Sequence, residues 1–291
     1  MSERNKSSTS QSDDDQIERY ALELSTRQVE NDWNNLIGVF FFNIVLLLLI
    51  IFVFYQFDLF KPISDLTFGL FNETLTATLI LIVIVIWGGI IRKSNQEWAN
   101  IGVNNTDVKV ACLITGILWI AMNLIELFIG FVVNGKIIFN SIWAENGITV
   151  VIGYLIAQLF GVAIQEELLF RGYLFPQLTT KANSKWQDNP TLAVFVAIMA
   201  ANIFFSLMHV PIQLYYANDI LTILWNLFIL LGLGVFFTLI YLLTENLWIA
   251  IGVHALGNTP TLIVSHIISP NVVLYVMVLI LCLIWPGIQK E

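Results

Sequence analysis

The chain has 291 residues, of which 57% are hydrophobic and 12% are charged, and its mean hydropathy is +0.80. Soluble domains carry about 45–50% apolar and about 25% charged residues, so this composition excludes an ordinary water-soluble protein. The formal net charge is −8 and no basic stripe is present, which excludes nucleic acid as a partner. Both cysteines, Cys112 and Cys282, lie in apolar runs and offer neither a disulfide framework nor a paired metal site.

Residues 1–34 form a polar segment that carries four basic and eight acidic side chains. The first 15 residues are rich in Ser and Asp, and we expect them to be disordered because they cannot bury enough apolar surface. The remainder, Gln16–Asn34, predicts a short helix at the membrane interface. Its apolar positions at helical spacing are Ile17, Tyr20, Ala21 and Leu24.

The rest of the chain predicts an all-α, polytopic membrane protein with about eight transmembrane helices around an intramembrane active-site cavity. A helix needs about 20 mostly apolar residues to cross the hydrocarbon. Backbone in lipid must satisfy its own hydrogen bonds, and the runs are too long for barrel strands. The eight apolar stretches lie near 36–57, 75–91, 110–133, 148–177, 190–209, 221–243, 246–267 and 271–286.

The basic residues predict the orientation of these helices, because cytoplasmic loops are enriched in Lys and Arg. With eight spans and a cytoplasmic N-terminus, 11 of the 13 basic residues fall on the inner side. Only Lys61 and Lys136 fall outside. We therefore expect a multi-pass integral membrane protein with both termini in the cytoplasm.

Ionisable residues inside the spans are few, and each is a functional hypothesis because a charge costs at least about 2.5–3.5 kcal/mol at the bilayer centre. The segment EELLFR places Glu167 and Arg171 four residues apart, on one helix face, where they can form an ion pair. Glu166 is turned about 100° away and needs a polar partner from another helix or from a water-filled cavity. Glu167 and Arg171 could alternatively form an ion pair with a purely structural role.

Two further pairs are spaced by one helical turn. His254 and Asn258 can aim two hydrogen-bond donors at one point, which suits a developing oxyanion. His209, one turn after Phe205, could join Glu166 to polarise a water molecule as a general base. Each of these residues could also be an ordinary interhelical hydrogen bonder or a packing residue. The functional reading is favoured because the Glu166–Glu167 pair, His209, and the His254–Asn258 pair lie on three separate predicted helices, in a chain with only three histidines.

Two other ionisable residues have no companion motif. Glu126 is most simply a neutral, hydrogen-bonded carboxyl group, with a functional role as the alternative. His266 is expected to be interfacial and inert.

The ordered motifs EExxxR, FxxxH and HxxxN resemble those of the CAAX prenyl protease and bacteriocin-processing (CPBP) intramembrane proteases, the type II CAAX endopeptidase superfamily. The flanking runs RGYLF and TENLWIAIGVHALGN are also similar to the family's pattern, and no motif position departs from it. The resemblance covers roughly 145–262. It divides the chain into a cytoplasmic tail (1–34), N-terminal transmembrane helices (35–144), a CPBP-like catalytic core (145–262), and a C-terminal transmembrane helix and tail (263–291).

The resemblance implies proteolysis of a membrane-associated, prenylated or peptide substrate by a glutamate-activated water. Glu166 would be the base and His209 its helper, while His254 and Asn258 would stabilise the oxyanion. Glu167, Arg171 and Phe205 would support the site. No cofactor is favoured. Zinc remains an alternative, since Glu166, His209 and His254 could provide a three-ligand catalytic site, but no HExxH spacing supports it.

One expectation concerns depth in the membrane. With the span limits above, Glu166 lies roughly 16 Å from the inner surface and His209 roughly 28 Å. The two can meet if 181–195 extends the helices into the cytoplasm, which we favour, or if the helices tilt strongly around a cavity.

Two other classes of function compete with the protease. A non-catalytic scaffold, immunity factor or regulator could use the same fold, although intact motifs argue against it. An ion-coupled transporter could use Glu126, Glu167 and Arg171 as a relay, but the broken-helix pairs typical of transporters are missing from the sequence.

Overall fold

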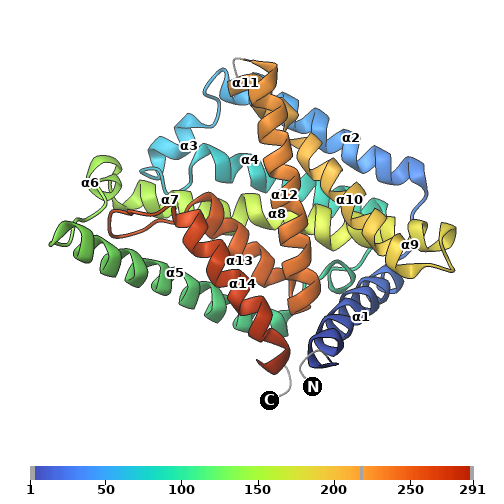
Figure 1. The fold of residues 1–291 in the computed structure, drawn as a ribbon. Helices are drawn as coiled ribbons and strands as arrows, with labels where there is room; N and C mark the ends of the chain where they lie inside the picture. Colours follow the sequence, from blue (N-terminus) through green and yellow to red (C-terminus); the bar gives the residue numbers. More distant parts are fainter. Residues whose placement is uncertain (1–3, 217–218, 289–291) are drawn as a thin grey trace. The chain divides into compact units, whose positions relative to one another are not determined.

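The computed structural model describes residues 4–216 and 219–288, and the regular secondary structure within them is helical apart from one isolated β-bridge, Phe139 to Val264 (Figure 1). Six helical stretches of this described part are long and apolar enough to cross a membrane. The all-α, polytopic fold predicted from the sequence is thereby confirmed. The six stretches are Trp33–Tyr55, Glu73–Lys93, Ala99–Asn134, Ile148–Lys185, Pro190–Tyr216 and Ile220–Thr244.

The last two predicted spans are shorter apolar helices, Leu247–Asn258 and Pro270–Trp285. The seventh was expected to continue to residue 267, but it ends at Asn258. Pro260 explains this end, because proline cannot continue a helix and disfavours the helical conformation of the residue before it. The chain beyond pairs instead with the segment before α6 (Ile142–Asn146), where Ser265 N donates to Ile138 O at 2.9 Å.

The chain divides into two compact units. The first comprises the described residues of Met1–Leu47, together with Val85–Val103 and Glu166–Leu247, and the second comprises Leu48–Ile84, Asn104–Gln165 and the described residues of Trp248–Glu291. The helices of the first unit are α1 (Arg4–Arg27), α2 (Trp33–Leu49) up to Leu47, η2 (Ile82–Lys93) from Val85, η3 (Ala99–Ile101), the end of α8 (Ala163–Glu167), η5 (Leu168–Leu174), α9 (Phe175–Lys185), α10 (Pro190–Met208), α11 (Val210–Tyr216) and α12 (Ile220–Thr244).

The second unit holds the remaining helices. They are η1 (Ile50–Tyr55), α3 (Lys61–Leu66), α4 (Glu73–Leu81), α5 (Asn105–Asn134), α6, α7 (Ile148–Ala157), η4 (Gln158–Val162), the start of α8, α13 (Leu247–Asn258) from Trp248, and α14 (Pro270–Ile288). The segments η1, η2, η4 and η5 are π-helical, a wider winding that often occurs at functional sites.

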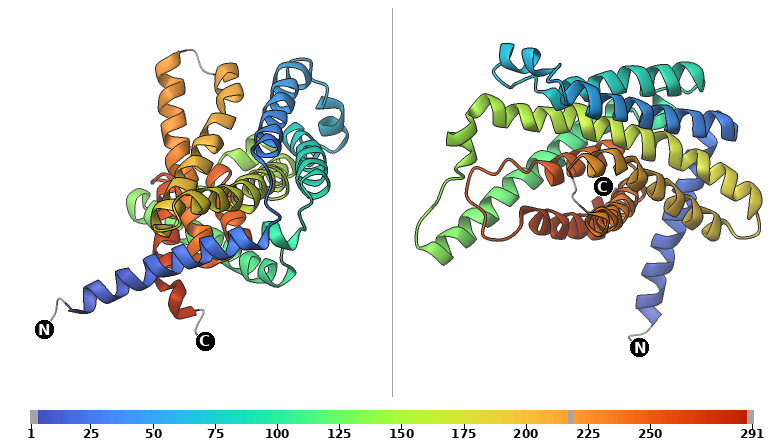
Figure 2. Two further views of the ribbon diagram at one scale, coloured as in Figure 1. Left: turned by 90° about the vertical axis from the view of Figure 1, so that its right-hand side faces the viewer. Right: turned by 90° about the horizontal axis from the view of Figure 1, so that it is seen from above.

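A helical hairpin forms the centre of the first unit. The chain leaves α9, turns over 186–189, and returns as α10, which packs against both α9 and α12 (Figure 2). Asn189 caps α10, since its Oδ1 accepts the N–H of Leu192 at 3.0 Å, and Pro190 occupies the first turn, where a missing N–H costs nothing.

The N-terminal helix differs from the expectation in two ways. Helix α1 begins at Arg4, so residues 4–15 continue a helix instead of being disordered, because extending a formed helix avoids the cost of nucleation. Its apolar stripe packs on α9, α10 and α12 of its own unit, and Tyr20, Ala21 and Leu24 are at most 3% exposed. An amphipathic stripe fits a protein face as well as a membrane interface. Residues 1–3 and 289–291 of the two predicted tails, including Lys290, lie outside the described residues.

Candidate active site

Glu166 and His209 lie together in the first unit. Oε1 of Glu166 is 3.8 Å from Nε2 of His209, and both side chains are largely buried, at 11% and 19% exposed. The separation is too long for a direct hydrogen bond, but both atoms can contact one bridging water. The pairing predicted for these two residues is thus present.

The position of the turn in the hairpin explains why the two residues meet. Glu166 lies 19 residues before Lys185, the end of α9, and His209 lies 19 residues after Pro190, the start of α10. Both are therefore roughly 28 Å from the turn. The depth mismatch arose because the fourth span was taken to end at 177, whereas the helical run continues to Lys185. Residues 181–195 comprise the end of α9, the turn and the start of α10, and the cytoplasmic placement of this extension stays a prediction.

The ring of His209 is held in one orientation. Its Nδ1 is 2.9 Å from the carbonyl oxygen of Phe205. A carbonyl can only accept, so Nδ1 carries a proton, and Nε2 is the ring atom that faces Glu166. The Phe205 ring packs edge-on against the imidazole with centroids 4.9 Å apart, as the FxxxH motif predicts. This arrangement suits a histidine that orients a water molecule.

Arg171 and Glu167 form the predicted ion pair, with Nη1 to Oε1 at 3.0 Å and both side chains at most 1% exposed. The guanidinium also lies 4.5 Å from the centroid of the Phe205 ring, which is the ring that packs on His209. The ion pair is therefore linked through the Phe205 ring to His209, one of the two candidate catalytic residues. A cation over an aromatic face is stabilising when it is desolvated.

Three further groups complete the shell of Arg171, and the sequence analysis did not single them out. Nε donates to Thr238 Oγ1 at 3.3 Å, and Nη2 donates to Asn202 Oδ1 at 3.1 Å and to Gly234 O at 2.8 Å. A Cβ at Gly234 would come within 2.6 Å of Asn202 Oδ1, so this contact between α10 and α12 requires glycine. The available signal was a polar Asn202 two turns before His209 in an otherwise apolar span.

The third motif lies in the second unit, on α13. His254 is 3% exposed, whereas the Asn258 carboxamide is accessible and lines a cavity of about 380 Å³ at the end of the helix. Asn258 Nδ2 donates to Oε1 of Gln158 at 2.9 Å. Gln158, at the start of η4, was also missed, although it too is a polar residue inside an apolar span.

Glu126 and His266 occupy different environments in the second unit. Glu126 is fully buried on α5, and its Oε2 accepts the N–H of Ile267 at 2.8 Å. With Asn123, whose Oδ1 accepts the N–H of Ile263 at 2.8 Å, it ties the loop after α13 to α5. The hydrogen-bonded carboxyl expected for Glu126 is present. His266 is exposed and lies at the cavity that Asn258 lines.

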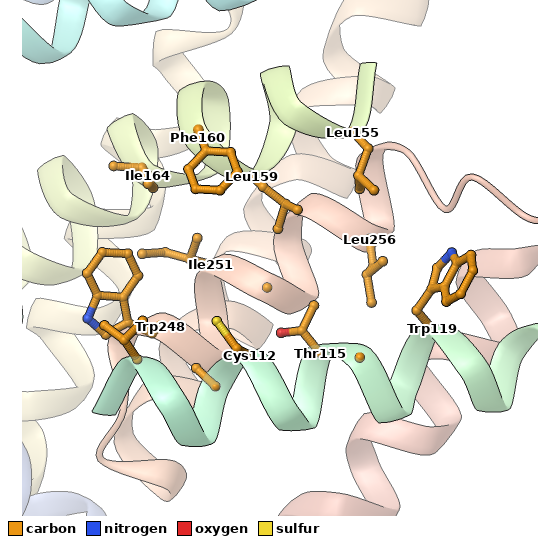
Figure 3. Close-up of a pocket in the computed structure, with 14 residues that line it drawn as sticks. Cys112, Thr115, Trp119, Leu155, Leu159, Phe160, Ile164, Trp248, Ile251 and Leu256 are labelled. Atoms are coloured by element: carbon orange, nitrogen blue, oxygen red, sulfur yellow. The ribbon is translucent and has the colours of Figure 1, made fainter. Parts of the chain in front are cut away.

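A second cavity of the same unit is almost entirely apolar (Figure 3). It measures about 360 Å³ and lies between α5, the α7–η4–α8 helical run and α13. Cys112, Thr115 and Trp119 line it from α5, and Trp248 and Leu256 from α13. None of the specified Glu, Arg, Phe, His and Asn positions of the three motifs lines it.

The residues fit a zinc ion only in part. Within either unit, no three His, Cys, Asp or Glu side chains of the described part gather as a metal site requires. Glu166 and His209 would give two ligands, one fewer than a catalytic zinc takes from protein. The third candidate, His254, belongs to the other unit.

These features define a helical integral membrane protein with a buried glutamate–histidine pair supported by an ion-pair network. Residues 148–260 match the family model described as "Type II CAAX prenyl endopeptidase Rce1-like". This match confirms the resemblance drawn from the motifs. The chain matches no curated protein and no solved structure.

Proposed function

We propose that this chain is an intramembrane endopeptidase in which Glu166 activates the water that cleaves the substrate. The observation that supports this most directly is the 3.8 Å approach of Glu166 Oε1 to Nε2 of His209, within a family of CAAX prenyl endopeptidases. A carboxylate and an imidazole at this separation can both contact one water, which the carboxylate can deprotonate as a general base.

In the proposed reaction, Glu166 takes a proton from the water while His209 orients it. The water oxygen attacks the carbonyl carbon of the scissile peptide bond and forms a tetrahedral oxyanion. Glu166 then returns the proton to the leaving nitrogen as the carbon–nitrogen bond breaks. The products are a carboxylic acid and an amine, so the sum is hydrolysis.

His254 and Asn258 are proposed to stabilise the oxyanion. Their support is the HxxxN motif within the matched segment and the exposure of the Asn258 carboxamide at a cavity wall. Donors that point at developing negative charge in a water-poor site are worth more than in bulk water.

Glu167, Arg171 and Phe205 are proposed as supporting residues. The ion pair is buried, its guanidinium donates to Asn202, Thr238 and Gly234 O, and Phe205 contacts both Arg171 and His209. Removing any of the three should disturb the orientation of His209 before it affects substrate binding.

The proposed substrate is a membrane-associated peptide or protein, such as a prenylated CAAX sequence, and the proposed orientation has both termini in the cytoplasm. The orientation follows from the basic residues, 11 of which fall on the inner side. A non-catalytic scaffold is the alternative that the following test addresses.

The test uses an internally quenched farnesylated CAAX peptide and the full chain in detergent. Glu166→Gln and His209→Ala should each lose nearly all cleavage while melting at the wild-type temperature, because glutamine is nearly isosteric but cannot take a proton. The double variant should be hardly worse than either single variant, since residues that act as a unit are non-additive. Full activity of Glu166→Gln would refute the protease and favour the scaffold.

Glu126→Gln is the matched control. It makes the same change at another buried carboxyl, and the amide oxygen can still accept the N–H of Ile267. Its activity should stay at the wild-type level. If Glu126→Gln is as inactive as Glu166→Gln, loss of activity does not identify the base.

A metal-dependent mechanism makes a different prediction. A chelator would then abolish cleavage, and the purified protein would hold one equivalent of zinc that His209→Ala loses. Without metal, activity is insensitive to chelator and both proteins are zinc-free.

A further inference from the structure

The side chain of Gln158 contacts the candidate oxyanion residue Asn258. Asn258 Nδ2 donates to Gln158 Oε1 at 2.9 Å, and the two residues lie 100 positions apart in the chain, on α13 and η4 of the second unit. This contact joins two side chains on different helices.

The hydrogen bond determines how the Asn258 carboxamide is oriented. A carboxamide nitrogen carries two N–H donors in one plane. When one of them engages Gln158, the direction of the second N–H is set. A carboxamide without such a partner can rotate about its terminal bond, whose torsional wells are broad.

Gln158 itself sits on a well-anchored segment. Three residues further, a Cβ at Gly161 would come 2.2 Å from Thr78 Oγ1, so η4 lies directly against α4. The acceptor is therefore carried by a backbone with little room to move. Its π-helical winding is of the kind that often accompanies functional residues.

Asn258 and Gln158 have different roles because only Asn258 contacts the cavity. Asn258 lines the cavity of about 380 Å³ at the end of α13, whereas Gln158 is not one of the described residues that line it. Asn258 can therefore reach a ligand in the cavity, and Gln158 acts on Asn258.

We propose that Gln158 is a positioning residue that fixes the orientation of the carboxamide of Asn258, the proposed oxyanion donor. The inference rests on the proposed protease function and adds to it a residue outside the three motifs. It predicts that Gln158 contributes to the rate of the chemical step and not to substrate binding.

The first experiment needs no substrate. Melting temperatures are measured in detergent for Gln158→Leu, Asn258→Leu and the double variant. If the two side chains are bonded, the double variant melts no lower than the worse single variant, since the bond can be lost only once. Additive decreases would overturn the proposal.

Gln213→Leu is the matched control for melting. It breaks another carboxamide pair, in which Asn226 Nδ2 donates to Gln213 Oε1 at 2.8 Å in the first unit. Combined with Asn258→Leu, it should give additive decreases. Non-additivity here too would mean that the melting cycle does not report contact, which removes its support.

The second experiment measures kcat and KM on the farnesylated CAAX peptide. Gln158→Leu should lower kcat about 10- to 100-fold and leave KM within about twofold of wild type. This decrease of kcat is smaller than the roughly 100- to 1000-fold decrease expected for Asn258→Ala, because the donor is misdirected but still present. Gln158→Glu should restore most of the rate, since its carboxyl oxygen still accepts from Asn258. In an Asn258→Ala background, Gln158→Leu should have no further effect.

In the kinetic experiment, three patterns among the variants with altered rates would overturn the proposal. They are an increase of KM with unchanged kcat in Gln158→Leu, failure of Gln158→Glu to recover the rate, and a full additional loss in the Asn258→Ala background. Absence of cleavage by the unmodified protein would refute the proposed protease instead. A cleaving wild type with an inert Glu166→Gln and a fully active Gln158→Leu would refute only this inference.

Discussion

The ion pair of Glu167 and Arg171 gives a prediction whose magnitude follows from its surroundings. Both side chains are at most 1% exposed, and three hydrogen bonds to Asn202, Thr238 and Gly234 O satisfy the guanidinium beyond the pair. Removing one partner leaves a buried charge uncompensated, which costs about 3–5 kcal/mol. We therefore examine Glu167→Gln, Arg171→Met and the double variant.

The two single variants should differ in a defined order. Glutamine can still accept a hydrogen bond from Arg171, so Glu167→Gln falls at about 3 kcal/mol. Arg171→Met removes the cation that faces the buried carboxylate of Glu167 and deprives Asn202 Oδ1 and Gly234 O of a donor, which places it at about 5 kcal/mol or above. The double variant removes both charges, so its loss of stability should be smaller than the sum of the two single losses by a coupling free energy of about 2–3 kcal/mol.

The assay is thermal unfolding in detergent. A loss of 1 kcal/mol shifts the melting temperature by about 2–4 °C for domains of 150–250 residues, so each single variant should melt roughly 6–20 °C lower. The surface pair of Glu23 and Arg27 is the control, because it has the same residue types and i, i+4 spacing at 2.7 Å but is 54% and 34% exposed. The same substitutions there should cost about 0.5 kcal/mol at most. If the buried pair behaves like the surface pair, the reasoning from burial is refuted.

Three further predictions concern other parts of the chain. A reporter fused after Lys136 should lie outside the cell and one fused within 181–188 should lie inside; the opposite result at either position would reverse the proposed orientation. Burial raises the pKa of Tyr20 above its usual 10, and its hydroxyl donates to Glu245 O at 3.0 Å. The stability from this group is therefore complete below pH 10 and is lost as the pH rises through the raised pKa, so proteolysis at Arg19 and Arg27 should increase in that range for wild type and show no such step for Tyr20→Phe. A Cβ at Gly252 would lie 1.9 Å from Thr115 Oγ1, so Gly252→Ala should destabilise by about 1–3 kcal/mol and Thr115→Ala should recover much of the loss; equal melting of Gly252→Ala and wild type would contradict this close contact.

Features that depend on neighbours along one helix could be predicted from the sequence. The spans follow from apolar runs of sufficient length, and the Glu167–Arg171 pair and the packing of Phe205 on His209 follow from spacings of four residues. The end of α13 at Asn258 was also encoded locally, by Pro260, but the apolar residues beyond it were taken to extend the span.

Features that depend on contacts between helices could not be predicted in the same way. The meeting of Glu166 and His209 required the turn at 186–189, which polar composition alone locates only to within several residues. Asn202 and Gln158 are visible as polar residues in apolar spans, yet nothing local assigns their partners. The apolar stripe of α1 was evident, but periodicity does not distinguish a protein face from a membrane surface.

The position of α1 has a consequence for how the chain is made. Thr180 Oγ1 donates to Ser25 O across 155 residues, and Tyr20 packs on Tyr241, which is further still along the chain. At about 5–20 residues per second, a ribosome needs roughly 8–30 s to synthesise the chain between Ser25 and Thr180. During that interval the apolar stripe of α1 lacks its surface of attachment, and the nearest apolar surface is the membrane into which α2 is being inserted. The apolar stripe of α1 can therefore bind the membrane surface before α9 is synthesised, and it packs on α9 in the folded protein.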